Sequence, residues 1–161
     1  MDLREESMVL HEKYNGKIET RAKVTLENDH DLAIAYTPGV AQPCLAIKAD
    51  PDRSFDLTCR GNMVAICTDG TRVLGLGNIG ARAAMPVMEG KAALFRRFGA
   101  VDAVPVCIDE PDKDKFIAIV KSLQANYAGI NLEDIQSPKC YDIEDELKKE
   151  LEIPVFHDDQ H

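Results

Sequence analysis

From Gly80 onward, apolar residues alternate between helical spacing and short continuous runs. In chain order, this pattern predicts a helix at 86–97, a strand at 103–108, a helix at 112–127, a strand at 129–131, a helix at 138–151 and a strand at 153–156. Pro86 and Pro138 suit first helical positions, and Ser137 suits an N-cap. Such alternation is typical of an α/β domain, with a mostly parallel sheet and flanking helices.

The first 60 residues follow a different pattern. Weakly apolar helical segments are expected at 2–14, 31–35 and 40–49, so residues 1–60 should form a mainly helical arm. Two apolar runs at 63–67 and 72–76 then flank an Asp-Gly pair. Asp-Gly between such runs predicts a β-hairpin, with which the sheet would begin.

Composition narrows the class of protein. With 161 residues, of which 45% are hydrophobic, the chain is long enough for one well-buried domain. A net charge of -9 argues against a nucleic-acid partner, which needs a basic face. No leader-like start and no apolar run of membrane-spanning length are present, so we expect a cytoplasmic protein without a membrane partner.

The five cysteines are far apart and form no Cys-x-x-Cys pair. That spacing suggests neither a disulfide framework nor a zinc site. We expect reduced, mostly buried thiols.

One lysine lies where an apolar residue is expected. Met88, Ala92 and Phe95 form the apolar stripe of the helix at 86–97, and Lys91 falls on that stripe. Desolvation there would depress the pKa of Lys91 and allow it to act as a general base. The alternative is that its aliphatic stem packs while the ammonium group reaches the rim.

Two acidic pairs directly follow predicted strands. Glu133-Asp134 come after the strand at 129–131, and Asp158-Asp159 after the strand at 153–156. The carboxyl ends of parallel strands meet at one sheet edge, where carboxylates repel one another unless a divalent cation or a lysine joins them. Oxygen ligands favour Mg²⁺ or Mn²⁺ over zinc. The alternative is that these side chains cap helices and face water.

Two further features have mainly structural interpretations. Tyr36 precedes a rigid Thr-Pro-Gly turn, and by itself is interpreted as an ordinary half-buried tyrosine. The segment 75–80 matches G-x-G-x-x-G, but the acidic residue nearest the required spacing, Asp102, precedes its strand. We interpret it as a tight loop close to a substrate; a dinucleotide site, which predicts NAD binding by this chain alone, is the alternative.

Several motifs together resemble malic enzymes of the short bacterial type, in order and spacing over nearly the whole chain. They are Tyr36-Thr37-Pro38-Gly39-Val40, Thr68-Asp69-Gly70, Leu74-Gly75-Leu76-Gly77-Asn78-Ile79-Gly80, Glu89-Gly90-Lys91, Asn131-Leu132-Glu133-Asp134 and Phe156-His157-Asp158-Asp159-Gln160-His161. The resemblance implies oxidative decarboxylation of malate to pyruvate and CO₂ with NAD or NADP and a divalent metal. It also implies a homodimer.

The resemblance further implies a role for each matching residue. Lys91 matches the family's general base, Tyr36 its general acid and Asp158 a carboxylate beside the lysine. The residues that match the metal ligands are Glu133, Asp134 and Asp159. Arg72 lies near the position of a malate-binding arginine, which is a weaker match.

In the mechanism so implied, the metal chelates the substrate, Lys91 takes the hydroxyl proton and Tyr36 returns a proton to C3 of the product enolate. Whether Tyr36 acts in its own or the partner subunit's site stays open.

The resemblance also predicts the domain organisation. Residues 1–161 correspond to the substrate- and metal-binding N-terminal domain, and the NAD(P)-binding domain that follows it in the family is absent from this sequence. We therefore expect a fragment that does not complete hydride transfer alone. The alternative function is a non-catalytic module for dimerisation and for metal and dicarboxylate binding.

Overall fold

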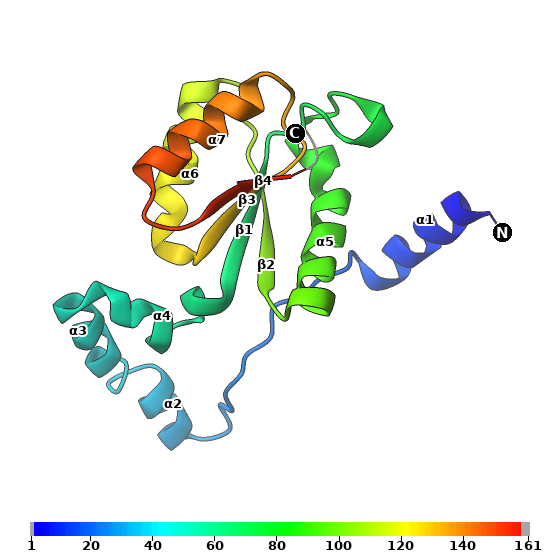
Figure 1. The fold of residues 1–161 in the computed structure, drawn as a ribbon. Coiled ribbons are helices and arrows are strands. Elements are labelled where there is room, and N and C mark those ends of the chain that lie inside the picture. The colour runs from blue at the N-terminus through cyan, green and yellow to red at the C-terminus, as the bar shows by residue number, and fades with distance from the viewer. Residues whose placement is uncertain (1, 159–161) are drawn as a thin grey trace. The chain divides into compact units, whose positions relative to one another are not determined.

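A computed structural model describes residues 2–158, and the part of the chain from residue 62 onward contains a parallel sheet (Figure 1). The sheet consists of β1 (Met63–Thr68), β2 (Asp102–Cys107), β3 (Gly129–Leu132) and β4 (Val155–His157), in the order β2-β1-β3-β4. All three strand pairings are parallel. The helices α5 (Gly80–Gly99), α6 (Lys113–Leu123) and α7 (Lys139–Glu150) connect successive strands. The expected α/β class and the alternation of elements are confirmed.

The helices form two layers around the sheet. Figure 1 shows α5 on one side of the strands, and α6 with α7 on the other. The chain runs from β1 through α5 to β2 at the edge, then returns through α6 to β3 on the far side of β1. The strand order therefore reverses between β1 and β3. In open α/β sheets, ligands bind beyond the carboxyl ends of the strands at such a switch point.

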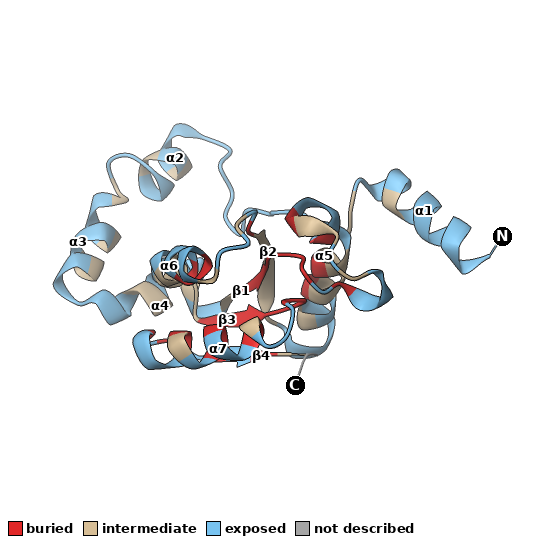
Figure 2. Cartoon of the chain, turned by 90° about the horizontal axis from the view of Figure 1, so that it is seen from above, coloured by how far each residue is buried: buried red, intermediate tan, exposed pale blue. Residues whose placement is uncertain are grey.

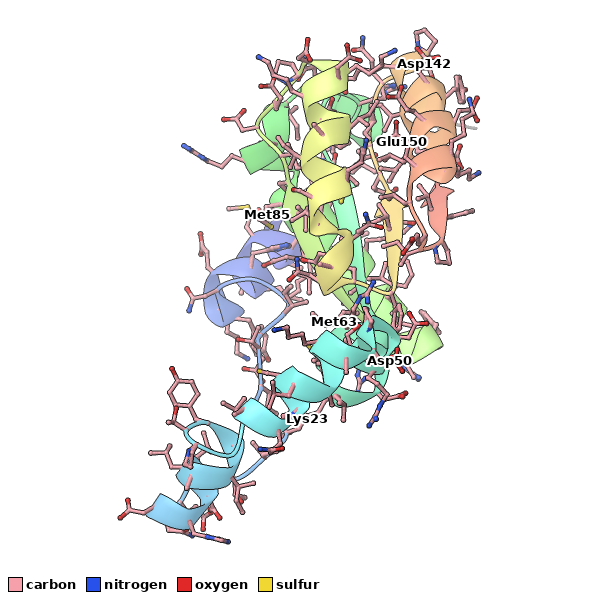
Figure 3. The ribbon with its side chains drawn as sticks, turned by 90° about the vertical axis from the view of Figure 1, so that its left-hand side faces the viewer. Lys23, Asp50, Met63, Met85, Asp142 and Glu150 are labelled. Carbon is pink, nitrogen blue, oxygen red and sulfur yellow. The ribbon has the colours of Figure 1, made fainter. Side chains whose placement is uncertain are left out.

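Helices α6 and α7, which cover the same side of the sheet, run side by side in the same direction (Figure 3). Near their first turns, Lys113 Nζ lies 3.4 Å from Asp142 Oδ2, and at their far ends Lys121 pairs with Glu150. Both ion pairs are exposed enough to contribute little stability each. Apolar packing beneath the helices therefore holds this layer in place.

The core lies at the sheet and the inner faces of the helices (Figure 2). Against α5, Ile66 packs with Met88 and Ala92, all at most 2% exposed. On the opposite layer, Phe116 of α6 and Leu147 of α7 are fully buried. The apolar stripe expected for the helix that carries Lys91 is thus confirmed.

The expected hairpin is wrong. Residues 74–76 form a 3-10 turn closed by an isolated bridge between Val73 and Gly77, and β1 pairs with β2 and β3 instead. The Asp-Gly turn packs against the start of α5, because the amides of Ile79 and Gly80 both donate to Gly70 O at 3.1 Å. Gly70 has φ +69, and a Cβ there would lie 2.3 Å from Gly80 O, so the turn closes a loop and not a strand pair.

Two helix starts also differ from expectation. Pro86 lies inside α5, which begins six residues earlier at Gly80. Apolar periodicity weakens across the small residues of that first turn and a half, which hid the true start. The N-cap of α7 is Pro138, without a side-chain cap, while Ser137 Oγ lies 3.3 Å from the Tyr141 hydroxyl.

The N-terminal part is mainly helical. It contains α1 (Leu3–Tyr14), α2 (Asp29–Ala35), α3 (Ala41–Ala49) and α4 (Ser54–Leu57), and none of these helices contains a buried residue. Residues Glu19–Gly61 form a compact unit of their own, separate from the unit that contains the sheet. Across residues 2–158, no helix is both long and apolar enough to cross a membrane.

All five cysteines are free thiols, as expected. Cys67 and Cys140 are buried and Cys107 is partly buried. Cys44 and Cys59 are exposed, which corrects the expectation of mostly buried thiols for these two. Both lie in the 19–61 unit, whose helices bury no residue.

Candidate functional site

Two of the candidate carboxylates, Glu133 and Asp158, follow neighbouring strands at the same level of the sheet. Cys67, Leu132 and His157 are aligned across β1, β3 and β4. The residue that follows β3 and the residue that follows β4 each make one further backbone bond: Glu133 N donates to Cys67 O at 3.0 Å, and Asp158 N donates to Leu132 O at 3.2 Å. Glu133 and Asp158 are therefore held beside each other at the carboxyl edge, next to the switch point.

Lys91 of α5 reaches both carboxylates. Its Nζ lies 3.0 Å from Glu133 Oε2 and also pairs with Asp158. The side chains of Lys91 and Glu133 are 23% and 8% exposed, so this pair is largely shielded from water, whereas the Asp158 side chain is 36% exposed. The structure thus brings together three predicted site residues, one from α5 and one directly after each of β3 and β4.

The expected depression of the pKa of Lys91 is wrong. Burial does lower the pKa, but the hydrogen bonds and charges of Asp158 and Glu133 outweigh it, and the net shift is upward. The apolar stripe revealed the desolvation, whereas the two carboxylates come from distant parts of the chain. In this structure Lys91 is therefore an ammonium ion.

Asn131 is a site residue that the sequence analysis did not identify. Its Nδ2 donates to Glu133 Oε2 at 3.1 Å, so this oxygen accepts from both Asn131 and Lys91. Asn131 is 2% exposed, and among residues 2–158 its Oδ1 has no hydrogen-bond partner. The period of two along a strand places residues 131 and 133 on one face, which is the signal that would have found it.

Asp134 turns away from the strand direction. It is 1% exposed and has φ +54, in the left-handed region that aspartate adopts more readily than most residues. Its backbone carbonyl accepts from Arg72 N at 3.0 Å. The Arg72 side chain is exposed and donates to Leu74 O at 2.6 Å, within its own loop.

A buried ion pair lies beside these loops and was also missed. Asp69 pairs with Lys139, and their side chains are 1% and 18% exposed. Asp69 Oδ1 accepts from Thr71 N at 3.0 Å and from Thr71 Oγ1 at 2.6 Å. Thr68-Asp69-Gly70-Thr71 has the composition of a turn, and nothing in that composition indicates a partner 70 residues away.

The remaining candidates lie elsewhere. Tyr36 is the C-cap of α2 in the 19–61 unit and is 68% exposed, so it is not a half-buried tyrosine. Asp159 lies outside the described residues. In the G-x-G-x-x-G segment, a helix does begin at its last glycine, Gly80, but a 3-10 turn and not a strand precedes it.

Two of the described residues have donor atoms that could hold a divalent metal. Glu133 and Asp134 are buried carboxylates, 6% and 1% exposed, at the switch point, and hard divalent cations prefer such oxygen donors. No cluster of three or more His, Cys, Asp or Glu able to hold a metal occurs within residues 2–158. The donor chemistry fits Mg²⁺ or Mn²⁺, and the third predicted ligand, Asp159, is beyond that range.

A shallow hollow of about 400 Å³ is lined by Lys91 together with Leu94, Phe95, Phe98 and Gly99. The Lys91 ammonium group is paired with Glu133 and Asp158, and the rest of the lining is apolar, so the hollow suits a dicarboxylate poorly.

Comparison with known proteins decides the family. The model of the malic enzyme N-terminal domain matches residues 15–114, more than half of the chain. The chain belongs to the malic enzyme family. It is 55% identical over 161 residues to the bifunctional malic/malolactic enzyme of Bacillus subtilis, covering all of this chain and 39% of that protein. It is 50% identical over 160 residues to the NADP-dependent malic enzyme of Escherichia coli, covering 99% of this chain and 21% of that one.

Solved malic enzyme structures share the fold. The NAD-dependent malic enzyme of Thermotoga maritima matches with a TM-score of 0.93 and 48% identity, over 99% of this chain and 44% of that one. The malic enzyme of Pyrococcus horikoshii matches with a TM-score of 0.93 and 51% identity, over 99% and 37%. The chain thus spans less than half the length of each of these relatives.

Proposed function

We propose that this chain is the malate- and metal-binding part of an enzyme that oxidatively decarboxylates malate to pyruvate and CO₂ with NAD or NADP. The observation that carries the proposal is the joining of Lys91 to Glu133 and Asp158 at the switch point of the sheet. A protonatable group there meets two carboxylates beside a buried third, Asp134. Relatives of both nucleotide specificities match this chain, so either nucleotide is compatible with the proposal.

Glu133, Asp134 and Asp159 would hold Mg²⁺ or Mn²⁺. A bound divalent cation supplies positive charge that polarises the carboxylate and hydroxyl oxygens of malate. The burial of Glu133 and Asp134 suits this role because a cation at their oxygens offsets the cost of burying these carboxylates.

Lys91 would exchange a proton with the C2 oxygen of the substrate. The pKa of Lys91 is raised by Asp158 and Glu133 against the lowering effect of burial, so it must lose part of this ion pairing before it accepts a proton. Asp158 keeps the ammonium group directed at the edge when the pairing with Glu133 weakens. Tyr36, whose ring is exposed, would donate the proton to C3 that completes pyruvate.

Decarboxylation of oxaloacetate with Mn²⁺ tests this proposal, because that half-reaction needs no nucleotide. We expect the 161-residue chain to exceed free Mn²⁺ in rate and to lose that excess in Asp134→Asn. Asp145→Asn, at an exposed position of α7, is the matched control and should keep it. Lys91→Met should also lower the rate, with Lys121→Met of α6 as its control. Equal rates for Asp134→Asn and Asp145→Asn would refute the metal assignment.

We further propose that two copies of the chain pair through their N-terminal helices. Exposed apolar side chains on these helices support this, with Leu3 85%, Met8 60%, Ile34 61% and Leu45 58% exposed. Sedimentation equilibrium should give twice the chain mass, and Ile34→Asp should lower it; a monomer at micromolar concentration would refute the pairing. A dimer that binds Mn²⁺ without decarboxylating oxaloacetate would favour the non-catalytic module.

A further inference from the structure

The loops that follow β1 and β3 are joined by a chain of polar contacts that the proposed chemistry does not use. Lys139 pairs with Asp69, Asp69 Oδ1 accepts from Thr71 Oγ1 at 2.6 Å, and Thr71 Oγ1 accepts from Gln136 N at 2.9 Å. We call these four residues the Thr71 relay. It connects the first turn of α7 to the segment directly after Asp134.

The direction of each bond in the relay is determined by chemistry. A hydroxyl carries one hydrogen, and a backbone amide can only donate. Because the Gln136 amide cannot accept and the Asp69 carboxylate can only accept, the hydroxyl hydrogen is directed to Asp69. Lys139, 18% exposed, also donates to Pro111 O at 3.1 Å and holds Asp69 from its other side.

The loop that follows β1 anchors the backbone at Asp134 and again two residues after it. Its own carbonyl accepts from Arg72 N at 3.0 Å, and two residues later the Gln136 amide donates to Thr71 Oγ1. Asp134 has φ +54, a conformation that most side chains rarely adopt and that persists only when the surrounding structure imposes it. The Glu133 amide before Asp134, which donates to Cys67 O at 3.0 Å, and the two anchors at and after it restrain the backbone on both sides of this residue.

We propose that Thr71 is a positioning residue that holds Asp134 in its left-handed conformation and so directs its carboxylate to the cation. Asp69 and Lys139 act one step behind it by keeping the Thr71 hydroxyl turned toward Asp69. The inference rests on the proposed function, because it assumes that Asp134 is a metal ligand. Residues that orient a ligand in this way affect metal affinity about 10- to 100-fold when substituted.

Two measurements on the 161-residue chain test the inference: the Mn²⁺ dissociation constant, from the electron spin resonance signal of free Mn²⁺, and hydrogen exchange of the Gln136 amide. Thr71→Val, which keeps the shape and removes the hydroxyl, should weaken Mn²⁺ binding about 10- to 100-fold and speed Gln136 exchange. Thr71→Ser, which keeps the hydroxyl, should stay within about threefold of the parent. Lys139→Met should weaken Mn²⁺ binding by a smaller factor. It tests the relay with a substitution in α7, outside the loop that follows β1.

The variant Asp134→Asn distinguishes failure of the positioning role of Thr71 from failure of the metal assignment. If it and Thr71→Val both weaken Mn²⁺ binding while Thr71→Ser does not, the inference stands. If Asp134→Asn weakens binding while Thr71→Val and Lys139→Met bind like the parent, the positioning role is overturned and the metal site survives. If the parent chain binds no Mn²⁺, or Asp134→Asn binds like the parent, the metal assignment fails and the inference fails with it.

Discussion

Replacing Lys139, the positively charged partner of buried Asp69, should destabilise the fold far more than replacing an exposed lysine. Lys139→Met leaves the Asp69 carboxylate, 1% exposed, without its counter-charge. Breaking a buried pair by removing one partner costs about 3–5 kcal/mol. Asp69 retains both bonds from Thr71, at 3.0 and 2.6 Å, so we expect the lower end, about 3 kcal/mol. That loss is a large part of the free energy of unfolding of a typical domain, which is roughly 5–15 kcal/mol.

Urea unfolding followed by circular dichroism measures this loss, with Lys113→Met as the matched control. Lys113 and Lys139 are both the first residues of their helices, so effects of the helix dipole cancel in the comparison. Lys113 pairs with Asp142 at 3.4 Å with side chains 37% and 63% exposed, and its removal should cost about 0–1 kcal/mol.

The double variant Lys139→Met with Asp69→Asn should recover part of the loss, because no buried charge then lacks a partner. Equal destabilisation by Lys139→Met and Lys113→Met would refute the reasoning. So would a double variant less stable than Lys139→Met alone.

Three further outcomes follow from burial and charge. Burial raises the pKa of the Cys67 thiol to about 12, so at pH 8 it should resist Ellman's reagent in the folded protein while exposed Cys44 reacts; comparable rates would contradict this. Met88→Ala should cost about 2–5 kcal/mol in urea unfolding, against less than about 1 for Leu94→Ala, which is 54% exposed. Because carboxylates raise the pKa of Lys91, its ammonium signal should titrate above that of ordinary lysines by NMR, and any ion-pair stabilisation should disappear only as pH rises through that higher pKa.

Sequence patterns were sufficient for the elements that burial dictates. The alternation after Gly80 was predicted because each strand and each helix stripe faces the same core, so periodicity reports directly on packing. Glu133 and Asp158 were placed at one edge for a related reason, since each directly follows a buried strand. Local signals failed where a distant partner decides the outcome. The Asp-Gly turn packs against α5 and therefore closes no hairpin.

Features that depend on contacts between distant segments were not accessible from the sequence. The order β2-β1-β3-β4, and with it the switch point, arises from pairing between strands far apart in the chain. The predicted direction of the pKa shift of Lys91 was wrong because its two carboxylate partners lie in distant segments, directly after β3 and β4. Asp69 and Lys139, 70 residues apart, carry no mutual signal in a single sequence.

The contact between Lys91 and Asp158 has a consequence for the order of folding. It joins residues 67 positions apart and is complete only when β4, an edge strand, has docked beside β3. Contacts of such long sequence separation are costly in chain entropy and tend to form after local structure. Substitutions at these two positions should therefore change how fast the chain unfolds more than how fast it folds. Substitutions of Lys91 and Asp158 should consequently have little effect on the folding step in which the sheet first forms.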